Sequence, residues 1–353
     1  MHILITGAGP TGLTAAVELS RLGFQTTVID QSENPSLLSR AVGILPKSLY
    51  ILKPSGVTDL LLTEGIKIRE GRFFLGTEQP LSISLQGGHP EYDFLLALAQ
   101  DRTEALLRQV YEQHGGVVHY GSKLTGLRQT ENQVFAQIND GEEQAFDYLI
   151  GADGVHSTVR KSLDIGYDGF QLPETWSIAD VDAINWPHAE NICLMTLSAG
   201  RIVVVVPLAE NRYRVVSNTP AALETLPVPM EVQKVRRTDD FHISIRQVHE
   251  YQRSRVFLAG DAAHCHSPAG GRGMNLGIAD AADLAQRFQT GTLDGYQKSR
   301  SPEGAHTIKL SERLRKTMTS SNPFVKGLRW SVLKTISKSS YLQRKLARII
   351  LTG

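Results

Sequence analysis

The sequence has few cysteines, no excess of one charge and no long apolar run, and each lack excludes a class of protein. Its two cysteines, Cys193 and Cys265, offer neither a disulfide framework nor the ligand spacing of a zinc site. The net charge of +1 gives no electrostatic reason to expect a nucleic-acid partner. No apolar run reaches the roughly 20 residues of a membrane-spanning helix, and the apolar N-terminus enters a glycine turn, unlike a signal peptide. We expect a cytoplasmic protein without metal.

The N-terminus combines an apolar strand, a glycine-rich turn and a helix. Residues 2–5 lead into Gly7-x-Gly9-x-x-Gly12, and a second strand follows the helix and ends at Asp30. Glycine at these positions permits a tight turn, close approach of a pyrophosphate and close helix–strand packing. A carboxylate at Asp30 can accept both hydroxyls of an adenosine ribose but would repel a 2′-phosphate. The segment predicts a site for FAD or NAD, the alternative being a tight turn without a ligand.

Two further glycine-containing segments follow apolar strands. Residues 151–160 carry Asp153 and run from a strand into the start of a helix. Gly260-Asp261 stands at another strand end, where the carboxylate can hydrogen-bond a polyol. Residues 268–275 then bring backbone N–H groups to a helix start, an arrangement that suits a partly negative heterocycle. Between these two segments, at 175–184, 192–197, 201–206 and 212–217, the pattern predicts a sheet with short turns.

These three motifs, in this order and spacing, resemble the aromatic-hydroxylase group of FAD-dependent monooxygenases, which share the p-hydroxybenzoate hydroxylase fold. Three further segments resemble its phenol-hydroxylase and polyketide-hydroxylase branch, namely Ser39-Arg40-Ala41, Gln100-Asp-Arg-Thr-Glu104 and Tyr251-Gln-Arg253. The likeness covers about residues 1–290 and is loose at 167–241.

The resemblance implies an α/β fold with a Rossmann-like FAD-binding domain of the glutathione-reductase type and an inserted, mainly β substrate domain. We expect the discontinuous FAD-binding domain at 1–68, 98–165 and 253–298, and the substrate domain at 69–97 and 166–252. Residues 299–353 would form a C-terminal helical segment. In the phenol-hydroxylase branch a thioredoxin-like domain follows this point, and we expect this chain to lack it.

The resemblance also implies a set of FAD-binding residues. Asp30 would bind the adenosine ribose, Arg40 the pyrophosphate, and Gln100 and Asp261 the ribityl chain, while the motif of Asp153 serves both FAD and transient NAD(P)H. The Leu124 backbone would lie near adenine, and the segment from Pro268 would line the isoalloxazine. The full expected set is Gly7, Gly9, Pro10, Thr11, Gly12, Asp30, Arg40, Gln100, Leu124, Asp153, Gly260, Asp261, Pro268, Gly271, Gly273, Met274 and Asn275.

The reaction implied by the resemblance has two halves. NADH or NADPH reduces FAD and leaves, and O2 then gives a C4a-hydroperoxyflavin that transfers one oxygen atom to a small aromatic or hydrophobic substrate. The sequence has no second glycine-rich βαβ unit, which agrees with a donor that docks transiently. A base would help to deprotonate a phenol. His242, His249 and Tyr213 are candidates by location alone, and a packing or surface role is the alternative for each.

Other flavin-binding proteins have different activities and different motifs. A halogenase would show Trp-x-Trp-x-Ile-Pro and a geranylgeranyl-reductase-like enzyme Trp-x-Phe-Pro, and neither string occurs. A ubiquinone-pathway type of hydroxylase at the membrane surface remains open, as does a non-catalytic FAD-binding sensor. Arg272 stands where glutamine is more common in the phenol-hydroxylase and polyketide-hydroxylase branch. Its cation would either favour the anionic reduced flavin or face solvent.

The C-terminal region is basic. From residue 301 to 353 there are eleven lysines and arginines against two acids. The segment 326–350 can be drawn as amphipathic helices with apolar Leu328, Val332, Leu333, Ile336, Leu342, Leu346 and Ile349. Two readings follow: helices docked on the protein's own body with their lysines in water, or peripheral attachment to an anionic membrane surface.

Overall fold

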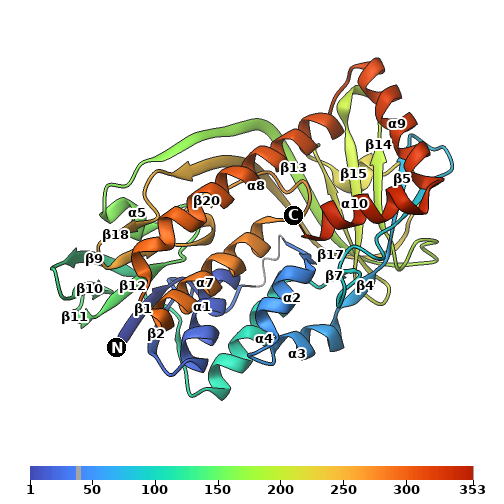
Figure 1. The fold of residues 1–353 in the computed structure, drawn as a ribbon. Coiled ribbons are helices and arrows are strands. Elements are labelled where there is room, and N and C mark those ends of the chain that lie inside the picture. The colour runs from blue at the N-terminus through green and yellow to red at the C-terminus, as the bar shows by residue number, and fades with distance from the viewer. Residues whose placement is uncertain (37–40, 353) are drawn as a thin grey trace.

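The computed structural model describes residues 1–36 and 41–352, arranged around two main β-sheets (Figure 1). The first sheet has six strands, in the spatial order β18 (Gln252–Arg253), β19 (Val256–Leu258), β12 (Tyr148–Gly151), β1 (His2–Thr6), β2 (Gln25–Ile29) and β8 (Val118–His119). Its strands from β19 to β8 run parallel. Ile3, Leu4 and Ile5 of β1 are wholly buried, as the central strand of a parallel sheet requires when both faces are covered.

The helices of this first unit pack on one another beside the sheet. Helix α1 (Pro10–Arg21) contacts both α4 (Gln100–Gln113) and α7 (Gly273–Thr290). A three-stranded sheet, β11 (Glu143–Phe146), β10 (Val134–Ile138) and β9 (Leu124–Gln129), adds Val134, Ala136 and Phe146 to the same core. The short helix α5 (Thr158–Ser162) contacts β9.

The second main sheet has eight strands. In spatial order they are β20 (His264–Cys265), β17 (Glu231–Val248), β13 (Tyr167–Ile184), β16 (Arg212–Ser217), β15 (Ile202–Ala209), β14 (Ile192–Thr196), β5 (Glu70–Leu75) and β6 (Leu81–Ser84). On its outer face, Val181, Val205 and Val215 pack with the helix α6 (Ala222–Thr225). On the opposite, inner face, Val206 packs against Val42, which precedes the small sheet of β3 (Gly43–Ile44), β7 (Leu95–Ala97) and β4 (Ile66–Ile68).

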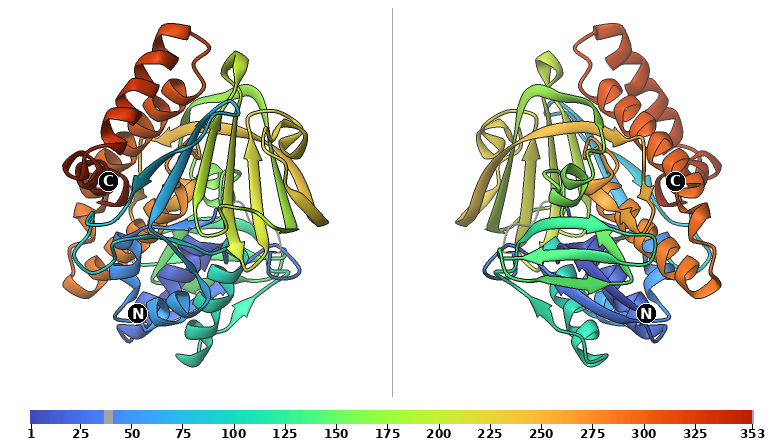
Figure 2. Two further views of the ribbon diagram at one scale, coloured as in Figure 1. Left: turned by 90° about the vertical axis from the view of Figure 1, so that its right-hand side faces the viewer. Right: turned by 90° about the vertical axis from the view of Figure 1, so that its left-hand side faces the viewer.

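The remaining helices cover the sides of both units. Helices α2 (Pro46–Leu52) and α3 (Val57–Glu64) are separate because Pro54, which interrupts a helix, falls between them. The C-terminal region forms α8 (Tyr296–Met318), α9 (Pro323–Ser337) and α10 (Ser340–Thr352). Figure 2 shows these orange and red helices along one side of the eight-stranded sheet, where α9 and α10 both contact β6. Among the residues that the structure describes there are also three 3-10 turns: η1 (Ser198–Gly200), η2 (Gly260–Ala262) and η3 (Leu293–Gly295).

Two findings bear on the sequence-based expectations. Strand β17 was not predicted, although it pairs with β13 over nearly the whole length of both strands. In the part of the chain that the structure describes, no helix combines the length and the apolar content needed to cross a bilayer.

Candidate functional site

The first glycine motif forms the turn between β1 and α1. Gly7 has a φ of +99°, and a Cβ there would lie 2.3 Å from the carbonyl oxygen of Ala152. A Cβ on Gly12 would lie 1.9 Å from the Gly7 carbonyl oxygen, whereas a Cβ on Gly9 would meet nothing within 4 Å. The protein's own packing therefore requires two of the glycines, and the third leaves an open surface at the helix start.

The start of α1 offers hydrogen-bond donors on that open surface. Leu13 N–H donates to the Gly9 carbonyl at 2.9 Å and makes the first helical bond. Thr11 and Gly12 therefore carry amides without a helical acceptor, and Pro10, the first residue of α1, has no N–H to satisfy. Such amides at a helix N-terminus attract a phosphate.

Asp30 lies beside this turn at the end of β2. Its two carboxylate oxygens accept the N–H groups of Ala8 at 2.7 Å and Ser32 at 2.8 Å. Its carbonyl oxygen accepts Ser122 N–H at 2.8 Å, which brings the start of β9 at Leu124 to the same end of the sheet. Asp30 and Leu124 thus lie together at the end of the site where the family resemblance predicts adenosine.

The second motif caps α5 and leaves one polar atom unused. Asp153 Oδ2 accepts the N–H groups of Thr158 at 2.7 Å and Val159 at 3.1 Å. Its Oδ1 is buried and has no hydrogen-bond partner within the described residues. Burial raises the pKa of Asp153. A polar group of a ligand would satisfy this oxygen, because an unpartnered buried acceptor is unfavourable.

The third motif packs directly on the first. Gly260 has a φ of +60°, and a Cβ there would lie 2.4 Å from Thr11 Oγ1. A Cβ on Gly277 of α7 would lie 2.1 Å from the same oxygen. Both positions therefore need glycine, and this close packing presents the exposed Asp261 next to the start of α1.

A buried carboxylate that the sequence reasoning missed holds the third motif in place. Asp280, wholly buried in α7, accepts Gly260 N–H at 3.0 Å and contacts His264 Nε2 at 2.6 Å. Arg300 Nε donates to its other oxygen at 2.7 Å. Burial alone would raise the pKa of Asp280, but His264 and Arg300 outweigh it and hold that pKa below its ordinary value. The sequence did hold one indication of this role, because Asp280 is an acidic residue within an alanine-rich helix whose neighbouring positions are apolar, and a buried acid needs partners.

The residues expected at the isoalloxazine lie at the start of α7. The first helical bond joins Leu276 N–H to the Arg272 carbonyl at 2.9 Å, so the amides of Gly273, Met274 and Asn275 have no helical acceptor. Pro268 is exposed. Gly271 is exposed as well, with a φ of +62° and nothing within 4 Å of an added Cβ.

The side chain of Asn275 makes its hydrogen bonds to other groups of the protein. Its Oδ1 accepts Leu45 N–H and the Ser48 hydroxyl, both at 2.8 Å. Its Nδ2 donates to the carbonyls of Gly43 at 2.9 Å and Gly271 at 2.8 Å. With these four bonds the side chain ties the 43–48 segment to the loop before α7, so Asn275 can offer a ligand its backbone N–H rather than its amide.

Gln100 lies at the start of α4, beside Ala41. Its Oε1 accepts Ala41 N–H at 3.0 Å and its Nε2 donates to Glu104 at 2.8 Å. Burial raises the pKa of Glu104 to about 7. Arg40 itself lies outside the described residues.

The three candidate bases do not lie at this site. Tyr213 belongs to the apolar cluster on the outer face of the eight-stranded sheet. His242 and His249 have exposed side chains, and His249 Nε2 lies 2.6 Å from Asp168. The structure thus favours the packing and surface alternatives for all three. For Arg272 the structure excludes the solvent-facing alternative, because the side chain is buried.

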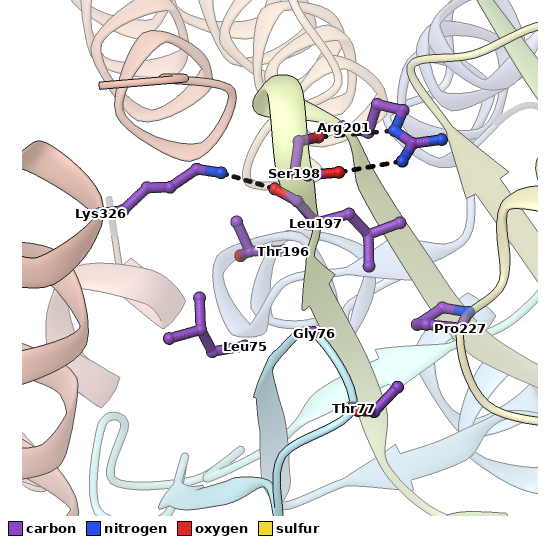
Figure 3. A pocket seen from close by; sticks show the side chains of 9 residues that line it. All are labelled: Leu75, Gly76, Thr77, Thr196, Leu197, Ser198, Arg201, Pro227 and Lys326. Carbon is purple, nitrogen blue, oxygen red and sulfur yellow. Dashed lines mark hydrogen bonds between the residues drawn. The ribbon is translucent and has the colours of Figure 1, made fainter. Parts of the chain in front are cut away.

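A surface hollow of about 420 Å³ lies at the edge of the eight-stranded sheet (Figure 3). Gly76, Ser198 and Lys326 are among its lining residues, and Lys326 Nζ donates to the Leu197 carbonyl at 2.7 Å. The hollow includes no residue of the three glycine motifs, so it is separate from the candidate site. The Lys326 bond instead attaches α9 to the sheet.

Taken together, the open amides at two helix starts, the unpartnered Asp153 oxygen and the carboxylate of Asp30 fit a dinucleotide with a negative pyrophosphate.

Comparison with known proteins agrees with a dinucleotide site. The chain matches the family described as FAD binding domain over residues 1–231 and 214–309. It is 32% identical over 336 residues to rifampicin monooxygenase of Rhodococcus hoagii, covering 87% of this chain and 69% of that protein.

A second relative, pentachlorophenol 4-monooxygenase of Sphingobium chlorophenolicum, is 29% identical, with 87% of this chain and 64% of that protein covered. The chain therefore belongs to the family of FAD-dependent monooxygenases, and FAD is its cofactor. The halogenase-like, reductase-like and sensor alternatives are not favoured.

Solved structures confirm the expected fold class. p-Nitrophenol 4-monooxygenase PnpA from Pseudomonas putida DLL-E4 superposes with a TM-score of 0.90 at 21% identity, covering 99% of this chain and 98% of that one. OxyS anhydrotetracycline hydroxylase from Streptomyces rimosus gives 0.81 at 29% identity, covering all of this chain and 76% of that one. The α/β fold with a mainly β substrate region is thus shared with both.

Proposed function

We propose that this protein transfers one oxygen atom from O2 to an uncharged aromatic or hydrophobic small molecule, with NADH or NADPH as the electron donor. FAD, when bound, takes up the hydride and activates O2. The chain binds and orients the reactants and excludes water. The observation that carries the substrate class is the chemistry of the inner face of the eight-stranded sheet.

A row of apolar side chains crosses that inner face. The register pairs Phe73 with Leu194, Leu194 with Val204, Val204 with Val216, and Val216 with Ile178. The first four are half-buried, so their apolar surface is not fully covered by the protein. An apolar substrate that covered this row would remove that surface from water.

The charges next to this row neutralise each other. Arg214 and Asp180 are buried and form two hydrogen bonds, each of 2.7 Å. Arg214 also donates to the Ala41 carbonyl at 3.4 Å, toward the proposed FAD site. A bidentate pair of this kind leaves little uncompensated charge for a substrate carboxylate. This supports an uncharged substrate against the sheet.

For the cofactor, we propose that Gly7, Gly9, Pro10, Thr11 and Gly12 hold the pyrophosphate, with Asp30 and Leu124 at the adenosine end. Gln100, Asp153, Gly260 and Asp261 would lie along the part of FAD between the pyrophosphate and the ring, which includes the ribityl chain. The start of α7 would contact the isoalloxazine ring through Pro268, Gly271, Gly273, Met274 and Asn275. We also propose the FAD-binding unit at 1–68, 98–165 and 253–298, the substrate unit at 69–97 and 166–252, and the helical segment from 299.

The test is anaerobic reduction of the holoenzyme by NADH and by NADPH, with a panel of phenols, quinolones and polycyclic compounds and their carboxylated analogues. We expect neutral members to accelerate flavin reduction and then to be oxygenated in air, and the carboxylated analogues to do neither. Preferential stimulation by the carboxylates would overturn the substrate class. NAD(P)H consumption that no compound affects would argue against the activity.

A second candidate role concerns α9, which carries an exposed apolar stripe. Phe324, Leu328 and Val332 are 77%, 56% and 48% exposed and follow one another at four-residue intervals. From residue 323 to 352 the sequence has seven lysines and arginines and no acid. We propose that this face contacts an anionic membrane surface, from which a hydrophobic substrate could be drawn. The stripe also shows that docking on the protein's own body does not account for all the apolar residues.

This second proposal is tested by cosedimentation with vesicles of anionic or neutral phospholipid. The triple variant F324S/L328S/V332S and removal of residues 326–353 should both abolish binding to the anionic vesicles. The variant Y50S, which changes an exposed tyrosine on α2, is the matched control. Unchanged binding after the truncation, or equal binding to neutral vesicles, would disprove membrane contact, and self-association through the stripe would identify a different partner.

A further inference from the structure

The apolar row on the inner face of the eight-stranded sheet ends at a carboxylate. Strand β17 continues the row beyond Ile178, because the register pairs Ile178 with Asp239. Residues directly opposite each other on paired strands have their side chains on the same face of the sheet. The side chain of Asp239 therefore lies on the inner face, next to the last apolar residue of the row.

This row lies between two parts of the inner face that the protein itself covers. Side chains two positions apart on a strand share a face, so Val206 and Ile202 flank Val204 of the row in β15. Val206 is buried against Val42, which precedes β3. Ile202 is buried in a cluster against which Ile308 of α8 packs. Val204 between them is only half-buried, so the row is apolar surface that neither contact covers completely.

Asp239 is held in place and keeps one oxygen available. Its Oδ2 accepts a hydrogen bond from Arg237 Nη2 at 2.8 Å. Its Oδ1 makes no hydrogen bond within the part of the chain that the structure describes, and the side chain is 29% exposed. An ionised carboxylate accepts hydrogen bonds and cannot donate them. Asp239 thus offers one fixed acceptor at the end of an apolar surface.

The charge of this carboxylate is balanced within the sheet. Arg237 lies opposite Asp180 in the register, and both oxygens of Asp180 accept hydrogen bonds of 2.7 Å from Arg214. The two arginines and the two aspartates carry no net charge together. A neutral O–H group can donate to Asp239, whereas an anionic group in the same place would meet a charge of its own sign. The acceptor therefore suits a hydroxyl group on an otherwise apolar molecule.

Protection of the sheet edge does not explain why Asp239 lies on this face. Strand β20 pairs only with Arg246 and Gln247, and charged side chains on such an edge discourage pairing with another chain. The neighbouring Asp240 already supplies an exposed charge there. It lies opposite Ser177, on the other face of the sheet. The position of Asp239 beside the apolar row therefore calls for a separate reason.

We propose that Asp239 determines how the substrate lies on the sheet, by accepting a hydrogen bond from a hydroxyl group at one end of it. The apolar part of the substrate then covers the row that begins at Ile178 and runs toward β5. Arg237 is a positioning residue, because it acts through the Asp239 carboxylate. The inference rests on the proposed substrate face of the eight-stranded sheet.

The experiment measures binding to the oxidised holoenzyme by titration calorimetry, without any reaction. The probes are matched pairs of a phenolic compound and its methyl ether, namely phenol with anisole and 1-naphthol with 1-methoxynaphthalene. Each ether keeps the ring and the oxygen but cannot donate a hydrogen bond. The wild type is compared with D239A and D239N. D240N is the matched control, because it removes a carboxylate from the opposite face of the same strand.

We expect the wild type to bind each phenolic probe about tenfold more tightly than its ether, which is the effect of one hydrogen bond to a charged acceptor. D239A should abolish this preference by weakening the phenolic probes alone. D239N should abolish it as well, because its oxygen can stay bonded to Arg237 while its N–H group replaces the acceptor. D240N should keep the wild-type preference. D239N also serves alone if D239A does not fold.

A preference for the phenolic probe that survives in both Asp239 variants would overturn the inference. Equal weakening of both members of a pair would do the same, because it would reduce Asp239 to a structural part of β17. If the wild type binds both members equally but still transfers oxygen, the role of Asp239 falls and the proposed function stands. If no probe binds, the proposed substrate face falls with it. The measurement needs neither a nicotinamide nor O2, so the preference can be read even if oxygen transfer fails.

Discussion

The carboxylate of Asp280 accepts the backbone N–H of Gly260 at 3.0 Å, so a residue inside a buried helix fixes the turn that presents Asp261. The same oxygen lies 2.6 Å from His264 Nε2, and Arg300 donates to the other oxygen. A positive φ at Gly260 and its packing on Thr11 leave that turn little freedom. The buried carboxylate of Asp280 in α7 therefore holds the third motif in position.

Removing this carboxylate should weaken both the fold and cofactor binding. In D280A, Arg300 would be left as an uncompensated buried cation, and we expect a loss of about 3–5 kcal/mol in the free energy of unfolding. Urea unfolding of the apoprotein and titration with FAD measure the two effects. D283N is the control, because Asp283 pairs with Arg287 at a partly exposed position of the same helix and should cost at most about 1 kcal/mol. Equal stability of the two variants would refute the role of Asp280.

Alanine at two glycines of the first motif should separate cofactor binding from folding. Gly9 has φ −77° and ψ −178°, which alanine adopts freely, and its Cβ would meet no protein atom within 4 Å. We expect G9A to fold with a stability within about 0.5 kcal/mol of the wild type, and to lose FAD affinity because the methyl group occupies the pyrophosphate surface.

G12A should behave in the opposite way, because its Cβ would lie 1.9 Å from a backbone oxygen and the turn would have to shift. We expect a loss of several kcal/mol, measured by thermal unfolding of both apoproteins. A G9A protein that binds FAD with wild-type affinity would show that the pyrophosphate does not approach this turn.

Glu104 should make stability depend on pH. Burial raises its pKa from 4.5 to about 7, so the folded state holds a proton that the unfolded state has released between these values. Stability therefore falls as pH rises through this window and is level above it. E104Q keeps the acceptor for Gln100 without the charge, so it should equal the wild type near pH 4.5 and be more stable at pH 8, by up to about 3 kcal/mol. Parallel unfolding curves at all pH values would contradict this.

Enlarging one residue of the apolar row should change substrate binding selectively. In V216F the added ring would fill space over the inner face, and we expect the KM for bulky substrates to rise about tenfold or more, with a smaller change for single-ring phenols. V235F makes the same substitution at an exposed position of β17 and should leave KM unchanged. Equal effects of V216F on small and large substrates would argue that this row does not line the substrate site.

Local sequence patterns predicted the elements whose structure is set by near neighbours. The apolar strand at 2–5, the helix after the first glycine turn and the strand that ends at Asp30 correspond to β1, α1 and β2, with ends displaced by a residue or so. The unpredicted β17 carries many charged residues in its first half, and only its last part, from Phe241 to Arg246, alternates apolar and polar residues. It forms a strand because it pairs with β13, a relationship between segments some sixty positions apart that no local pattern contains.

The site shows the same division. The sequence by itself determined the three glycine motifs and the carboxylates of Asp30, Asp153 and Asp261, because tight turns and helix starts depend on which residues follow one another. Only the tertiary structure decided three outcomes. Asp280 hydrogen-bonds the Gly260 backbone, the Asn275 side-chain amide bonds to the protein's own backbone, and Arg272 is buried rather than exposed to solvent. Those outcomes depend on which distant elements pack together, because a charge or an amide must find a hydrogen-bond partner once packing has removed it from water.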